Sequence, residues 1–143
     1  MSKNTAQEII DLGFAGVMFR KQNETDFGLF LDAVLAEQAL ILEGRIGSAA
    51  YTVATSPQKD YVKLAEKYLV AAELMSRRIT VVCEAAVGSG EKPRTDDEQK
   101  QRNDYRDRAN EWITKIVDGS ATDSTSGLVF GSLTTNRFQV SDS

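Results

Sequence analysis

The sequence predicts a mainly α-helical protein: a four-helix bundle with a flexible C-terminal tail that contains short β-strands. Apolar residues recur at spacings of three and four through residues 5–118, which is the period of a helix with one buried face. Two prolines, Pro57 and Pro93, fall where this periodicity pauses. We therefore divide the 143 residues into an α-helical bundle domain, residues 1–118, and a linker with a β-prone assembly tail, residues 119–143.

The first helix is predicted to be short and to cover residues 5–12. Thr5 and Glu8 have the spacing of a capping box, in which each side chain binds a free backbone amide of the other residue. Gly13 is suited to end this helix. The apolar stretch that follows, residues 14–22, predicts a turn with one further helical turn.

The second helix is predicted over residues 25–45, with Asn23 or Thr25 as its cap. Gly44 and Gly47 mark its end. One broad face of this helix is expected to be buried, and it carries Phe27, Leu31, Val34, Leu35, Ile41 and Leu42.

A loop over residues 48–55, which could include a short extended piece, precedes the third predicted helix. Ser56 and Pro57 predict its start, with serine as the N-cap and proline in the first helical position. The helix is expected to end near Ala85, and Cys83 is expected to be a small core residue. Its apolar stripe consists of Tyr61, Leu64, Tyr68, Ala72, Met75, Ile79 and Val82.

The fourth helix is predicted from Thr95, which begins a second capping box, to about Asp118, with Gly119 as the C-terminal cap. Its expected buried face consists of Tyr105, Ala109, Trp112, Ile113, Ile116 and Val117. Across the predicted bundle, the residues expected to be buried against the second helix are Leu64, Tyr68, Met75 and Trp112.

The tail differs in composition from the helical part. Residues 120–126 contain no large apolar side chain and predict a linker. The residues after them predict short strands, and an isolated hairpin of this size is marginal in water. Another surface is therefore needed to cover its apolar residues, which we expect to bind a partner: Leu128, Val129, Phe130, Leu133, Phe138 and Val140.

Composition argues against several classes of function. The chain has no histidine and one cysteine, which removes the commonest acid–base catalyst and any cysteine cluster for zinc. Its net charge is −4, whereas proteins that grip nucleic acid through its phosphates are normally basic. The apolar runs are too short to cross a membrane, and no signal peptide is recognised. We expect a cytosolic site of synthesis, no enzymatic activity, no cofactor and no metal.

Three local motifs have a structural explanation that we favour over a functional one. Asp96, Asp97 and Glu98 suit the positive end of a helix dipole better than a metal site, because adjacent helical residues do not converge on one point. Residues 88–92 contain glycines and a lysine but lack the spacing of a phosphate-binding loop. Arg77 lies four residues after Glu73, and the two are expected to form a surface ion pair.

The order of helices resembles the small head–tail connector proteins of tailed bacteriophages, also called head completion or adaptor proteins. The similarity covers roughly residues 5–118. It lies in the short helix at residues 5–10, the stretches Leu35-Ala36-Glu37 and Leu42-Glu43-Gly44-Arg45-Ile46-Gly47, and the helix from Tyr61 to Leu74 that continues into Arg77-Arg78.

This resemblance implies a structural subunit of the virion that is assembled in the host cytoplasm. Family members form a ring, commonly of twelve copies, at the head–tail interface beneath the portal protein. The ring extends the DNA channel, lets DNA pass without specific binding and presents a platform for the stopper or tail protein. In this family the C-terminal segment often reaches the portal, which would suit the tail described above. A different class remains open: a non-enzymatic helical protein-binding module whose tail orders when it meets a partner.

Overall fold

The computed structural model describes residues 2–124, and this part of the chain is almost entirely helical. The elements in chain order are α1 (Ala6–Ile10), the 3-10 helix η1 (Gly16–Phe19), α2 (Glu24–Ile46), α3 (Ser48–Tyr51), α4 (Gln58–Ser89) and α5 (Asp96–Ser124). The predicted mainly α-helical class is therefore confirmed. The finer prediction of a four-helix bundle is not confirmed, and the predicted tail strands lie outside the described residues.

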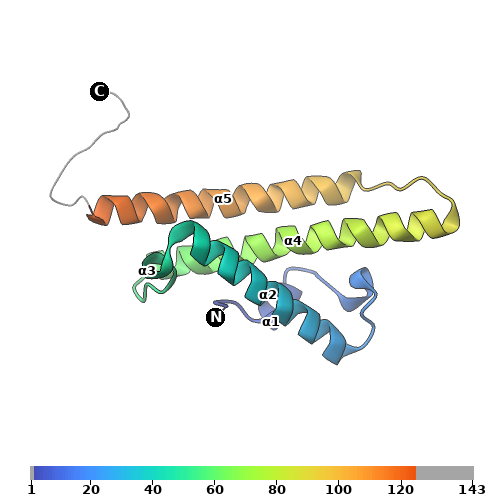
Figure 1. Cartoon of the computed structure of the whole chain (residues 1–143), viewed down its shortest axis with the longest axis horizontal. Helices are drawn as coiled ribbons and strands as arrows, with labels where there is room; N and C mark the ends of the chain where they lie inside the picture. The colour runs from blue at the N-terminus through green and yellow to red at the C-terminus, as the bar shows by residue number, and fades with distance from the viewer. Residues whose placement is uncertain (1, 125–143) are drawn as a thin grey trace, which may run out of the picture.

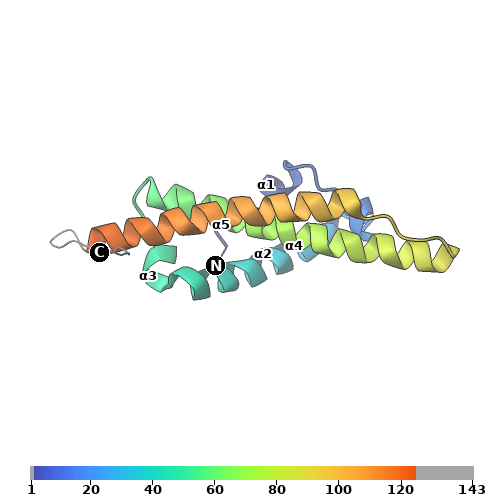
Figure 2. The ribbon, with the colours of Figure 1, turned by 90° about the horizontal axis from the view of Figure 1, so that it is seen from above.

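Helix α4 is the element on which the others pack. It forms a long antiparallel hairpin with α5, while α2 crosses the opposite side of α4 (Figure 1). The short elements α1, η1 and α3 also contact α4. Figure 2, turned by 90°, shows α5 crossing over α4, and both views place the α4–α5 turn beyond the other helices.

The buried core consists of two neighbouring clusters, and α2 and α4 contribute to both. The first cluster contains Ile9, Phe14, Phe19, Phe27, Leu31, Val34, Leu35, Val70, Ala71, Leu74 and Met75. The second contains Ala39, Leu42, Tyr51, Val62, Ala65, Ile113 and Ile116. The N-terminal elements thus pack on the middle of α4, whereas α3 and the second half of α5 pack near its beginning.

Several predicted helix ends are confirmed by their hydrogen bonds. Thr5 and Glu8 form the expected capping box of α1. The Asn23 side chain accepts hydrogen bonds from the backbone amides of Thr25 and Asp26 at the start of α2. Gly47 ends α2 with φ +89°, a backbone conformation that favours glycine because a Cβ atom is strained there.

The predicted boundaries around α4 are partly wrong. The loop expected over residues 48–55 contains helix α3 instead of an extended piece. The N-cap position of α4 is occupied by Pro57, not Ser56, and it provides no capping hydrogen bond from its side chain. The helix also continues past Ala85 to Ser89, where Gly90 adopts the left-handed conformation and its amide donates to the carbonyl groups of Ala86 and Val87.

The predicted end of the last helix at Asp118 is also wrong, because α5 continues through Gly119 to Ser124. A glycine inside a helix costs only about 1 kcal/mol relative to alanine, so it does not have to end one. At this position α5 runs close to the start of α4: a Cβ atom on Gly119 would lie 3.5 Å from the Gln58 side-chain nitrogen.

The predicted burial of four residues against α2 holds only for Met75. Leu64, Tyr68 and Trp112 are half-buried. The two aromatic residues instead occupy the contact between α4 and α5, where Tyr68 stacks on Tyr105 at 6.1 Å and Trp112 lies 5.1 Å from the Tyr61 ring. The prediction failed because α4 packs on two sides, so its apolar residues do not form a single stripe.

Two residues of α2 test the assignment of its buried face. Leu31 is fully buried, whereas Leu29, two positions earlier on the same helix, is 64% exposed. We predict that Leu31→Ala lowers the free energy of unfolding by about 2–5 kcal/mol. Leu29→Ala should change it by less than about 0.5 kcal/mol. Urea denaturation of both variants in dilute solution, followed by circular dichroism, checks this, and similar losses in both variants would contradict the packing.

Candidate interaction surfaces

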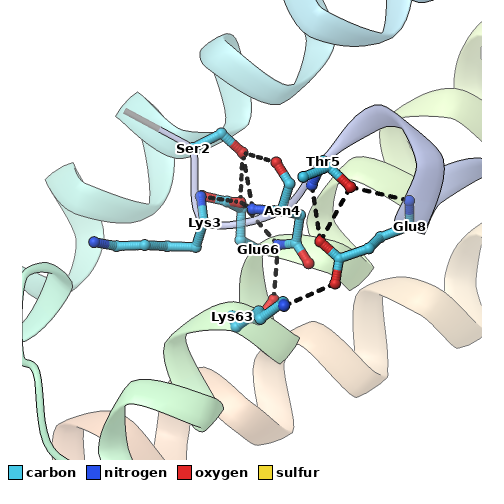
Figure 3. Close-up of polar contacts among 7 residues, drawn as sticks. All are labelled: Ser2, Lys3, Asn4, Thr5, Glu8, Lys63 and Glu66. Carbon is cyan, nitrogen blue, oxygen red and sulfur yellow. Dashed lines mark hydrogen bonds and ion pairs between the residues drawn. The ribbon is translucent and has the colours of Figure 1, made fainter.

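A buried carboxylate joins the N-terminal segment to α4. Glu66 lies between Val62 and Val70 on the buried face of α4, and none of its surface is exposed. One carboxylate oxygen, Oε2, accepts hydrogen bonds from four groups: the Ser2 hydroxyl at 2.8 Å, the Lys3 amide at 2.8 Å, the Asn4 amide at 3.0 Å and the Asn4 side-chain amide at 2.8 Å. Figure 3 shows these residues converging on the Glu66 side chain.

The other oxygen of Glu66 connects α4 to α3. Oε1 accepts a hydrogen bond of 2.6 Å from the Tyr51 hydroxyl. A buried carboxylate is costly unless its oxygens are well supplied with hydrogen-bond donors, and Glu66 has five. We conclude that Glu66 fixes the N-terminal segment and α3 against α4, which is a structural role.

Two pKa shifts describe the electrostatics of this region. The pKa of Tyr51 is raised above its usual value, first because the phenol is desolvated and then because its hydroxyl donates to Glu66. The pKa of Glu8 is lowered, chiefly by its contact with Lys63, whose Nζ lies 2.7 Å from Oε2, and by the Thr5 amide. Near neutral pH the first shift favours the neutral phenol that holds α3 on α4, and the second favours the charged carboxylate that holds α1 on α4.

The far end of the α4–α5 hairpin forms a second feature, which we name the distal arm and define as residues 76–94. Buried side chains of α4 end at Met75, and no residue of the distal arm is buried. It nevertheless carries apolar side chains such as Ile79, Val82 and Val87, of which Val87 is 78% exposed. Figure 1 shows the arm extending past α2 and η1.

A groove of about 890 Å³ lies along this arm, between α4 and the chain that leads into α5. Its apolar lining is Val81, Val82, Ala85, Ala86 and Pro93, and its polar lining is Arg78, Ser89, Glu91, Lys92 and Arg94. Three basic residues against one acid make the groove positively charged. An apolar floor with a basic rim is typical of a protein-binding surface more than of a catalytic site.

The residues singled out in the sequence are placed as follows. Glu73 and Arg77 form the predicted ion pair at 3.0 Å. Cys83 is half-buried on the distal arm, so its prediction as a core residue is wrong, because the core does not extend that far. The tail residues predicted to bind a partner (Leu128, Val129, Phe130, Leu133, Phe138 and Val140) lie outside the described residues.

Two features were missed in the sequence. Glu66 was not singled out, although a glutamate four residues from both Val62 and Val70 is a detectable signal of a buried charge. The distal arm was also not predicted. The apolar residues between 76 and 87 have the spacing of a buried helix face, and this spacing does not reveal whether a second element packs on that face.

Within residues 2–124 no group of three or more acidic or cysteine side chains could hold a metal ion. No helix in this described part is long and apolar enough to cross a membrane. The chain matches no known protein family, no curated protein and no solved structure. The surfaces described above are therefore the basis for assigning a function.

The hydrogen bond between Tyr51 and Glu66 predicts an alkaline loss of stability. Because folding raises the pKa of Tyr51, its contribution is complete below the unfolded-state pKa near 10 and is lost as pH rises toward the folded-state value. We expect the free energy of unfolding to fall more steeply above about pH 10 in the natural protein than in Tyr51→Phe. Urea denaturation between about pH 8 and pH 11 measures both slopes. Equal slopes would contradict the placement of this phenol.

Proposed function

We propose that this chain is a structural head–tail connector subunit of a tailed bacteriophage, which forms a ring beneath the portal protein. In that role the ring, of about twelve copies by the resemblance, extends the DNA channel and provides the platform for a stopper or tail protein. The subunit is made in the host cytoplasm and becomes part of the virion at the head–tail interface. The described helices serve as the body of the subunit, and in this proposal α1, α2, α4 and α5 act as its four-helix bundle.

The distal arm is the single observation that carries this proposal. A helix that extends past its own core is unfavourable for a protein that acts alone, because apolar side chains such as the exposed Val87 and the half-buried Val82 stay in contact with water. The cost is offset if a neighbouring molecule covers the arm in an assembly. Subunits of a ring have such neighbours on both sides.

Charge supports the same reading. A channel through which DNA passes should not hold its phosphates, and a subunit with a net charge of −4 repels them on average. The absence of histidine from the sequence further lowers the expectation of an enzyme.

The tail is the proposed contact with the portal. An extended segment gains most by adding to the edge of a neighbour's sheet, where the new strand satisfies its backbone groups and alternate side chains fill pockets. The apolar residues that would fill those pockets are Leu128, Val129, Phe130, Leu133, Phe138 and Val140.

The same features support a second candidate function, a protein-binding module that is not part of a virion. The basic, apolar groove of the distal arm would also suit a helical module that binds one protein partner. The two candidates differ in the partner, since only the connector should join heads that carry a portal.

Addition of the protein to portal-bearing heads that lack a connector tests the proposal. We predict that the full chain joins these heads, and that Phe130→Ser with Phe138→Ser prevents joining without changing the helical circular dichroism. The matched control is Val17→Ser, because Val17 is 71% exposed on η1 and does not belong to residues 119–143. Sedimentation of the heads measures the joining.

Three results would contradict the proposal. If the natural chain does not sediment with the heads, the connector function is wrong. If the double variant joins as well as the natural chain, the tail is not the portal contact. If the double variant loses its helical signal, the tail belongs to the core of its own subunit.

A further inference from the structure

Helix α2 has a second apolar face that the subunit leaves uncovered. Leu29, Ala33, Ala36 and Leu40 are exposed, and their spacings of four, three and four place them in one row along the helix. This row lies opposite Leu31, Leu35 and Leu42, which are buried against the rest of the protein. Leu40 is 69% exposed and its neighbour Ile41 is 45% exposed, so the expectation that Ile41 belongs to the buried face is wrong.

Acidic residues border this row, which we name the α2 outer face. Asp26 and Glu37 lie along one side of it, and Asp32 and Glu43 lie along the other. Glu37 shares the Arg77 guanidinium at 3.3 Å, whereas Asp32 is exposed on the surface. The face is therefore apolar along its middle and acidic at its margins.

The distal arm has the opposite charge and a similar length. Its groove has an apolar floor bordered by Arg78, Lys92 and Arg94, with Glu91 as the one acid. The distance along the helix from Leu29 to Leu40 equals that from Arg78 to Ser89, ~17 Å in each case. Arg78 is also fixed in position, because its Nη1 donates to the Met18 carbonyl oxygen at 2.9 Å.

We propose that the α2 outer face of one subunit binds the distal-arm groove of a second copy of this chain. The inference rests on the ring assembly of the proposed function and names the two surfaces that form each contact in it. The acidic margins of α2 meet the basic rim of the groove, and the apolar row covers the apolar floor.

The alternative pairing, in which two α2 outer faces bind one another, is disfavoured by charge. It would bring the acidic margins of both copies together, and like charges at an interface oppose association. Pairing of two distal arms would likewise bring basic rims together.

The two surfaces belong to different parts of the subunit. When two copies bind, the distal arm of one copy and the α2 outer face of the other therefore stay free to bind further copies. Association of this kind continues from copy to copy and ends only when a ring closes. A contact between identical faces would end at a dimer. The size of the assembly therefore distinguishes the two arrangements.

Charge reversal on the full chain tests the proposal. The α2 variant is Asp32→Lys, and the arm variant is Lys92→Glu with Arg94→Glu; all three residues are exposed. Lys100→Glu is the matched control, because Lys100 is exposed on α5 and does not line the groove. Sedimentation velocity from about 1 µM to about 1 mM gives the dissociation constants, and circular dichroism verifies that each variant is folded.

We expect the natural chain and Lys100→Glu to form species larger than a dimer. Each reversal variant should raise the dissociation constant at least about tenfold, and one chain that carries both reversals should recover most of the loss. A mixture of the α2 variant with the arm variant should also form species larger than a dimer, because the natural and the reversed contacts are both complementary between unlike copies.

Four results would overturn the inference: a monomer at every concentration, a natural assembly that ends at a dimer, an equal loss in Lys100→Glu, or no recovery when both reversals are combined. The proposed function is tested separately on portal-bearing heads. A chain that self-associates as stated but does not join heads would overturn the function alone. A chain that joins heads while its reversal variants self-associate normally would overturn the inference alone.

Discussion

Helix α4 has 32 residues, but the core of its own subunit covers only the part that ends at Met75. Beyond Met75, Arg77 still contacts α2 and Arg78 still contacts η1, but no residue of these turns is buried, so their apolar side chains are only partly removed from water. A helix gains most of its stability in a protein from the packing of its apolar face, and α4 has too little of that packing beyond Met75. The distal arm, its groove and the proposed contact between copies all follow from this mismatch of length.

Near the start of α4, in contrast, Glu66 increases the number of elements that pack on the helix. Its buried carboxylate requires donors, and the chain supplies them from residues 2–4 and from Tyr51. The N-terminal segment and α3 are thereby held in fixed positions on α4. The first part of α4 is therefore well packed, whereas no residue of α4 after Met75 is buried.

The sequence predicted the helices better than their packing. Capping residues such as Thr5 and Asn23 act locally, so the start of their helices could be read from neighbouring residues. The packing of Tyr68 and Trp112 could not, because a single periodic stripe cannot reveal that α4 has partners on two sides. Gly119 was misread for a related reason: a glycine permits a helix end without requiring one.

The candidate surfaces were even less predictable. Leu31 and Leu29 are the same residue type on one helix, and only the tertiary structure separates the buried one from the exposed one. Val82 fits a core stripe in the sequence and lines a groove in the structure. The apolar residues of each helix could be predicted. Whether a given one is covered by another part of the same subunit depends on where the core ends, and the sequence does not show that.

Zero-length cross-linking of mixed light and ¹⁵N-labelled copies tests most directly whether the distal arm is covered by a neighbour. A carbodiimide joins a carboxylate to an amine in direct contact, and a light–heavy product forms only between two copies. The account predicts light–heavy products that join Asp32 or Glu43 on α2 to Lys92 on the distal arm. Light–heavy products that join other surfaces, with none between α2 and Lys92, would contradict it.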